Sequence, residues 1–517
     1  MTAEPGTDDL NSIDIEHLKV VVALEESGRR RSVYAYNARP FSDSPNRLPG
    51  ITRASSETLV KTLKDDHVKW HAFFNDRGFH NHASHHLIAI YALGASGPLI
   101  EVAYATHVSF YNSYLEYFRA VLLKKSPAEV LEEYIFSAKA NIGGPGIEGH
   151  PRMLNRFLAA VVHPIIYVGY GLEFNILGLT AEGIAQTFIH HDDGGDHLVP
   201  PSLFDEAYGL SRLVPSLSLN SSGPKKAVHA FDILSRVLAD DQFAPSNVGV
   251  PLKEIIGQLF VHVTTKVGDA VSALAAEWVA DLQGGASATP EALSAKVEQL
   301  IWTNAILYGV GGWVARENSP FKKFNADFFL CHAPRHLLHL PPHFIHTLSP
   351  RASVLLLQSY FSMGLCWYIG QGRGALDLPG FYAATTTTPA PPLPPPAPHA
   401  ITLTPDDAAP NPWLPLVQST LVHPAEHLCK ITRALLHGAM AYGGRVPADF
   451  AGTALAGAGD VLDGSLFVRV AGLTQDRIGW LSSHPPSHHE PHQVKPGSSR
   501  EYYSRFGFRS VVHRNDR

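Results

Sequence analysis

The pattern of apolar and polar positions along the chain predicts helices almost throughout. Apolar side chains recur at spacings of three and four residues over long stretches, which is the periodicity of an amphipathic helix. Strictly alternating stretches are scarce, and no regular succession of strand and helix patterns is present, which argues against a Rossmann-like sheet. We therefore expect an all-α protein. The expected helical stretches are 56–64, 78–92, a helix opening at Ser126, 151–174, 227–239, 251–282, 290–308, 351–369 and 424–442.

Local signals sharpen some of these boundaries. Ser126 and Glu129 flank Pro127 in the order that a capping box requires, with the serine at the N-cap and proline at the first helical position. By the same reasoning Pro424 suits the first position of a helix. Pro164 interrupts an otherwise continuous apolar helix and predicts a kink or a restart there.

Composition shifts divide the chain into a large middle part and two ends. Residues 1–50 are polar and rich in proline and glycine, so we expect an irregular segment. Residues 51–483 form one expected helical domain, interrupted by a Thr/Pro-rich loop at 384–400 that cannot pack as a helix. Residues 484–517 are an expected solvated tail, and its histidines alone are weak grounds for a metal site. They are His484, His488, His489 and His492.

Charge and cysteine content narrow the class of protein. Lys and Arg number 41 against 47 Asp and Glu, a net charge of −6, which offers no basic field for nucleic acid or an anionic membrane. No uninterrupted apolar run reaches the ~18 residues of a membrane span. Three distant cysteines imply no disulfide framework, and with no secretory signal at the N-terminus we expect a cytoplasmic protein. The 29 histidines favour a metal site or acid–base chemistry.

The densest group of histidines follows Gly78 and comprises His80, His82, His85 and His86. On a helix His82 shares a face with His85 and His86, so two imidazoles could meet one metal ion, or one could bind it while its neighbours fix that ring's tautomer. The alternative is a helix start with partly buried histidines. The residue pattern leaves open which of the four is a ligand.

Three further histidines stand in apolar surroundings. His163 and His332 each end or interrupt an apolar, aromatic run, where an imidazole needs a polar partner. His427 and Lys430 are three residues apart and so share one face of a helix with apolar residues. A lysine in that position ordinarily extends its amine to solvent. The sharper hypothesis is that burial keeps the amine neutral and that it adds carbon dioxide, which gives an anionic carbamate beside His427.

Taken together, these segments resemble the questin oxidase-like family, whose fungal members act in anthraquinone and xanthone pathways. The resemblance covers about three quarters of the chain. It rests on Gly78–Ser96, His163–Phe174, Asp327–His332, Gly372–Leu378, Asn411–Trp413 and His423–Leu435. It implies a non-haem iron centre with four histidines and a carboxylated lysine. Carried onto this sequence, the ligands would be His82, His163, His332, His427 and Lys430.

Five such ligands would leave one octahedral position for O2, and imidazole with oxygen ligands suits Fe(II) better than a structural zinc site. The resemblance thus implies O2-dependent cleavage of a ring C–C bond in a polycyclic aromatic substrate, an anthraquinone or its hydroquinone. NADPH would act through a separate reductase, since no nucleotide-binding fingerprint is present. Three alternatives stay open: an NADPH-dependent Baeyer–Villiger oxidase without metal catalysis, a non-catalytic binder of aromatic metabolites, and a two-metal hydrolase.

Overall fold

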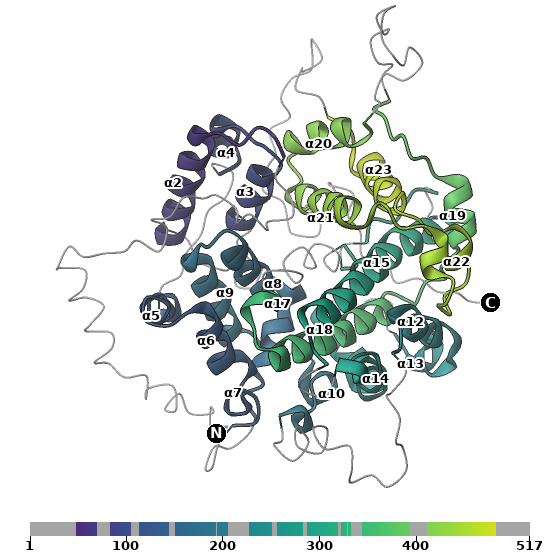
Figure 1. Ribbon diagram of the computed structural model, residues 1–517, viewed down its shortest axis with the longest axis horizontal. Coiled ribbons are helices and arrows are strands. Elements are labelled where there is room, and N and C mark those ends of the chain that lie inside the picture. Colours follow the sequence, from purple (N-terminus) through teal and green to yellow (C-terminus); the bar gives the residue numbers. More distant parts are fainter. Residues whose placement is uncertain are drawn as a thin grey trace, which may run out of the picture.

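The structure is a computed structural model, and it shows the all-helical architecture that the sequence predicts (Figure 1). Within the part of the chain that it describes, no β-strand is present. The described residues are 48–69, 83–104, 113–143, 150–192, 194–204, 227–250, 256–282, 287–318, 322–327, 329–331, 344–392 and 411–481.

Most expected helices are found close to their predicted limits, and several helices were not anticipated. The predicted ones are α2 (Arg53–Lys69), α3 (Ala83–Ala92), α6 (Pro127–Leu131), α8 (Met153–Glu173), α12 (Ala230–Ala239), α14 (Ile256–Trp278), α15 (Pro290–Val314), α18 (Pro350–Gly370) and α21 (Glu426–Tyr442). The additional ones are α4 (Gly97–Tyr104), α5 (Ser113–Leu122), α7 (Ala138–Ile142), α9 (Leu177–Ile189), α10 (Gly195–Leu198), α13 (Pro245–Val248), α17 (Ile345–Thr347), α19 (Leu378–Ala384), α20 (Trp413–Leu421), α22 (Ala458–Val461) and α23 (Leu466–Ile478). Short 3₁₀ turns and one π-helical turn, η2 (Glu132–Phe136), link some of them.

Two of the predicted helix starts can be compared with the structure. Ser126 caps α6 with its hydroxyl while Glu129 reaches back to the Ser126 N–H at 2.8 Å, so the predicted capping box is confirmed. The start predicted at Pro424 is wrong. Helix α21 begins at Glu426, because the His423 ring accepts the Ala425 N–H and holds the preceding residues in a turn.

The buried apolar side chains form two clusters that meet along α8 and α21. The larger is built mainly on α12, α14, α15, α18 and α23, and the smaller on α2, α3, α4 and the C-terminal half of α8. In Figure 1 the helices of the smaller cluster, α2 to α4, lie together at the upper left. Helix α21 contributes Leu428 and Ile431 to the larger cluster and Cys429 and Leu436 to the smaller, so it lies on the boundary between them.

Helix α8 packs closely along α9, and glycine makes this approach possible. A Cβ on Gly183 would come within 2.7 Å of the Pro164 carbonyl oxygen and 2.8 Å of the Val168 N. The same helix is broken just before Pro164: three consecutive residues, Ala160 to Val162, have left-handed backbone angles. The predicted interruption of this helix is thus confirmed, although the distortion lies in the turn that precedes the proline.

Two helices, α8 and α18, are long and apolar enough to cross a membrane by length and composition. In the structure 83% and 94% of their apolar windows, respectively, are buried against other parts of the protein. That burial is the behaviour of core helices and gives a membrane span little support.

Several predicted features lie outside the described residues. These are most of the N-terminal segment 1–50, the histidines His80, His82 and His332, part of the Thr/Pro-rich loop, and the tail 484–517. The subdivision of the chain at residues 50 and 483 stays a prediction.

Candidate metal centre

One face of α21 carries the two side chains that the sequence singled out, His427 and Lys430, together with His437. His427, Lys430, Ala434 and His437 follow each other at spacings of three, four and three, so they form one stripe along the helix. The residues that α21 contributes to the two apolar clusters lie on its other faces. A polar stripe is therefore enclosed where the two clusters meet.

Lys430 is buried in this stripe. Its side chain is 3% exposed and its Nζ is shielded from solvent, as is the imidazole of His427. The expectation from the segment alone, an amine extended to solvent, is wrong. Removing an ammonium group from water by itself disfavours its charged form. The neutral amine is the form that reacts with carbon dioxide.

His163 lies directly after the break in α8 and its tautomer is fixed by that break. Its Nδ1 lies 2.6 Å from the carbonyl oxygen of Ala160. In a regular helix that oxygen would accept from residue 164, which is a proline and has no N–H to donate. A carbonyl oxygen only accepts, so Nδ1 carries the proton and the lone pair of the neutral ring is on Nε2. Metal-binding histidines commonly donate their second ring N–H to such an acceptor, so the residue fits the role of a ligand.

Left-handed angles at Val161 and Val162 are costly for β-branched residues, about 1–3 kcal/mol each. The strain is concentrated in the turn that presents His163, as is common at functional sites.

Helix α3 brings a further histidine to His163. It packs against both α8 and α21, and Figure 1 shows it beside them. The ring of His85 lies edge-on to that of His163, with centroids 5.8 Å apart. His85 and His86 are both buried. Of the four histidines in the predicted cluster, the structure therefore describes two, and it places His85 next to a predicted ligand.

The structure describes three of the five predicted ligands: His163, His427 and Lys430. His82 and His332 lie outside the described residues. Among the residues that are described, no group of three or more His, Cys, Asp or Glu side chains is arranged to hold a metal ion. The five-ligand set stays a prediction.

A buried polar network beside His85 was not anticipated. Ser84 donates to Asp66 at 2.8 Å, and the His67 Nδ1 contacts the carboxylate of Glu182. All four are buried. A sequence signal exists for two of them, because Asp66 and His67 follow the buried residues Leu59 and Leu63 of α2 at helical spacing.

Tyr167 joins this network to the histidines. Its ring lies 5.3 Å from that of His85, and it follows His163 by one helical turn. Burial, reinforced by the carboxylates of Glu182 and Asp66, raises the pKa of Tyr167 well above its ordinary value. The phenol therefore stays protonated and can act only as a neutral hydrogen-bonding group.

A third buried acid lies close in sequence to the predicted ligand His332. Asp327 accepts the N–H groups of Phe329 and Leu330 at 2.8 Å each. Burial nevertheless raises the pKa of Asp327 to about 7.

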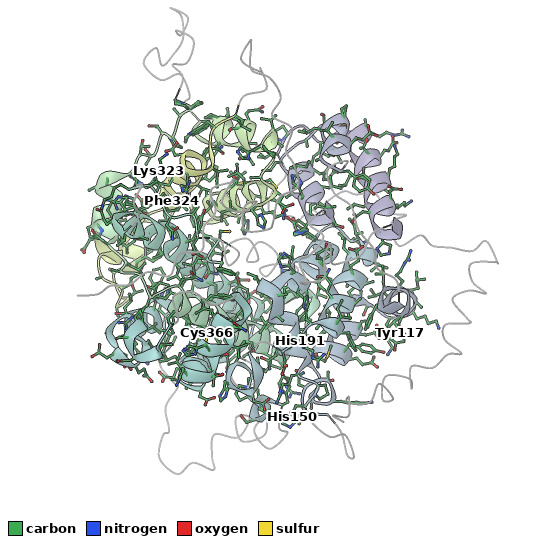
Figure 2. The ribbon with its side chains drawn as sticks, turned by 180° about the vertical axis from the view of Figure 1, so that it is seen from behind. Tyr117, His150, His191, Lys323, Phe324 and Cys366 are labelled. Atoms are coloured by element: carbon green, nitrogen blue, oxygen red, sulfur yellow. The ribbon has the colours of Figure 1, made fainter. Side chains whose placement is uncertain are left out.

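Not every gathering of histidines and carboxylates in this chain is a candidate site. At the surface, Arg152 binds the carboxylates of Asp192 and Asp196, both at 2.7 Å, and the His150 ring lies 3.6 Å from Asp196. His150 lies at the lower rim of the molecule in Figure 2. Because the guanidinium already binds both acids and offsets one of their two charges, this cluster is an ion-pair network and gives weak support for a cation site.

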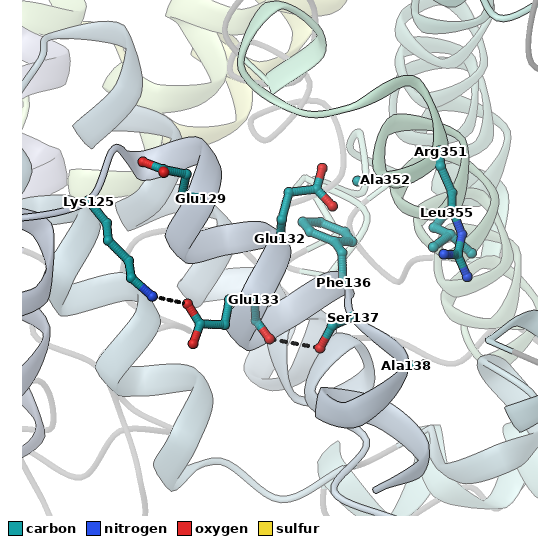
Figure 3. A pocket seen from close by; sticks show the side chains of 10 residues that line it. All are labelled: Lys125, Glu129, Glu132, Glu133, Phe136, Ser137, Ala138, Arg351, Ala352 and Leu355. Atoms are coloured by element: carbon teal, nitrogen blue, oxygen red, sulfur yellow. Dashed lines mark hydrogen bonds and ion pairs between the residues drawn. The ribbon is translucent and has the colours of Figure 1, made fainter. Parts of the chain in front are cut away.

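A surface cavity of about 600 Å³ lies between η2 and the start of α18 (Figure 3). Three glutamates line it, and each has a structural partner. Glu129 caps α6, Glu132 accepts the Ser349 N–H, and Glu133 pairs with Lys125. Local structural roles thus account for the three glutamates that line the cavity.

His423 makes the start of α21 sensitive to acid. Burial lowers the pKa of His423 from about 6.5 to about 4, and its Nδ1 accepts the Ala425 N–H at 3.0 Å. The unfolded chain takes up this proton more readily than the folded one. The neutral ring therefore contributes its full stability above pH 6.5, and that contribution is lost as the pH falls towards 4.

We expect His423→Asn, which keeps an acceptor but does not titrate, to lose less stability than the wild type between pH 7 and pH 5. Urea unfolding at the two pH values measures the difference. An identical loss in both proteins would exclude His423 as a source of acid sensitivity.

These features define a helical protein with buried histidines, a buried lysine and buried carboxylates on neighbouring helices. Residues 107–435, more than half of the chain, match the questin oxidase-like family. The chain belongs to the questin oxidase-like family, whose named relatives are oxidoreductases. The matched region includes His163, His332, His427 and Lys430, and it begins after the predicted ligand His82.

Curated relatives are distant. "Oxidoreductase AflY" of Aspergillus parasiticus is 27% identical over 223 residues, 36% of this chain and 43% of that protein. "Baeyer-Villiger oxidase ptaJ" of Pestalotiopsis fici is 27% identical over 172 residues, 28% of this chain and 37% of that protein. The chain therefore spans less than half the length of these two. "Baeyer-Villiger monooxygenase dmxR6" of Cryptosporiopsis sp. is 25% identical over 380 residues, 66% of this chain and 76% of that protein.

Proposed function

We propose that the protein is a non-haem Fe(II)-dependent oxygenase that cleaves a ring C–C bond of an anthraquinone-type polyketide. The observation that carries this proposal is the burial of Lys430 and His427 in one stripe of α21, at the boundary where α3 also packs against α8. A buried amine beside buried imidazoles favours a carbamate ligand in a mixed nitrogen and oxygen site.

The ligands we propose are His82, His163, His332, His427 and carboxylated Lys430. The ligand position that we assign to His82 has a second candidate, His85 of α3, because the ring of His85 lies beside that of His163. Fe(II), when bound, supplies the activation of O2. The chain's own contribution is to hold the His163 lone pair on Nε2 and to keep the Lys430 amine out of water.

The substrate class and the electron source are also part of the proposal. A flat, electron-rich hydroxyanthraquinone or its hydroquinone is the proposed substrate, and any NADPH requirement is assigned to a separate reductase. The names of the relatives favour a second candidate, a Baeyer–Villiger oxidase. We propose this candidate in the form of an NADPH-dependent enzyme without metal catalysis.

Removal of the metal separates the two candidates. Protein purified with Fe(II) should consume O2 with a hydroxyanthraquinone and its chemically reduced form, lose that activity on exhaustive chelation, and regain it when Fe(II) is returned in bicarbonate buffer. Full activity after chelation would exclude the iron proposal and leave the Baeyer–Villiger oxidase. Binding without O2 consumption would indicate a carrier, and two metal ions per chain with no need for O2 would indicate a hydrolase.

A further inference from the structure

A fully buried ion pair joins α21 to the end of α8. Arg433 and Glu173 have no exposed side-chain surface, and the guanidinium contacts the carboxylate directly. The rings of Tyr170 and Phe174 lie 5.5 and 5.6 Å from the guanidinium carbon, close enough for cation–π attraction. Arg433 is therefore held by one carboxylate and two rings, all from α8 or the residue after it.

This ion pair ties α21 to the end of α8, beside the segments that carry the predicted ligands. Arg433 of α21 meets Tyr170 and Glu173 of α8. His427 and Lys430 lie six and three residues before Arg433 on α21, and His163 lies seven residues before Tyr170 on α8.

We propose that Arg433 is a positioning residue of the metal centre, which sets the place of α21, and so of Lys430 and His427, relative to His163. This inference rests on the proposed function. Arg433 lies about one turn after Lys430 on the same helix, so the two residues move together whenever α21 shifts. A guanidinium fixes direction as well as charge, because its donors form a rigid planar fork.

Stability alone does not account for such a pair. Replacing a buried ion pair by well-packed apolar residues is often neutral or stabilising, whereas removing one partner is strongly destabilising. A positioning role therefore predicts a variant that stays folded but binds metal poorly. Glu173→Leu combined with Arg433→Met is that variant.

A matched control lies away from the predicted centre. Lys296 is buried, pairs with the partly exposed Asp281 at 3.0 Å and lies 5.4 Å above the Trp278 ring, so it also combines an ion pair with a cation–π contact. None of these residues belongs to α3, α8 or α21. Asp281→Leu combined with Lys296→Met removes this pair in the same way.

The experiment measures Fe(II) affinity by competition with a chromophoric chelator, without oxygen and in bicarbonate buffer, alongside thermal unfolding of the same samples. We expect the Glu173→Leu/Arg433→Met protein to remain folded and to bind Fe(II) about 10–100-fold more weakly than the wild type. The Asp281→Leu/Lys296→Met protein should bind Fe(II) as the wild type does.

Wild-type affinity in the folded Glu173→Leu/Arg433→Met protein would overturn the inference, as would an equal loss in the control. If that double variant does not fold, Arg433→Lys serves in its place, because it keeps the charge and loses the fork. It should also bind Fe(II) more weakly, and unchanged affinity would overturn the inference. A wild-type chain that binds no Fe(II) would instead refute the proposed function, and the positioning role with it.

Discussion

Lys430→Ala is expected to abolish stable iron binding and to lower turnover by about 100-fold or more. Loss of residues that only support a metal ligand already costs about 10–100-fold in affinity or activity, and a ligand should cost at least as much. The substitution removes the buried amine on which the carbamate would form. Iron content after gel filtration and O2 consumption with a hydroxyanthraquinone measure the two effects.

Two further substitutions at this position test the charge of the proposed carbamate. Lys430→Glu places a carboxylate in the same stripe and should keep part of the iron. Lys430→Gln introduces a side chain of nearly the same shape as glutamate but without its charge. This variant should lose the iron. Equal iron content in all three variants and the wild type would show that Lys430 is not a ligand.

The largest loss of stability is expected for Glu173→Gln. It removes the charge that compensates Arg433, which is fully buried. An uncompensated buried charge costs about 3–5 kcal/mol in the free energy of unfolding, a large share of the total for most proteins. Urea unfolding monitored by circular dichroism measures it.

Glu298→Gln provides the comparison, because its partner Arg445 is 45% exposed and solvent replaces the lost interaction. That variant should lose no more than about 1 kcal/mol. Equal losses in the two proteins would mean that the charge of Arg433 is not desolvated as the structure shows.

The sequence predicts the helical class and much of the helix pattern, because apolar spacing and caps are local properties. Helix α9 escapes prediction for a physical reason: Gly178 and Gly183 lower its helix propensity, yet Gly183 is what allows the close contact with α8. Packing between helices overrides local preference there. The misplaced start of α21 also has a local cause that the sequence pattern does not reveal, since the His423 ring accepts the Ala425 N–H and holds the residues before the helix in a turn.

The site is predictable only in part. His163, His427 and Lys430 stand out because a polar residue in an apolar helical stretch is visible in the sequence itself. Arg433 and Glu173 are 260 residues apart, so nothing local indicates that they meet. The same holds for His67 and Glu182, which are 115 residues apart.

The most direct test of the central claim is anomalous diffraction at the iron absorption edge, from crystals of the full chain grown without oxygen in Fe(II) and bicarbonate. We predict a single iron peak bounded by His163, His427 and a Lys430 side chain extended by carbamate density. Two predicted ligands that the structure does not describe, His82 and His332, should complete the shell, with His85 as the alternative to His82. An iron peak elsewhere, or a Lys430 amine without added density in an iron-free site, would contradict the account.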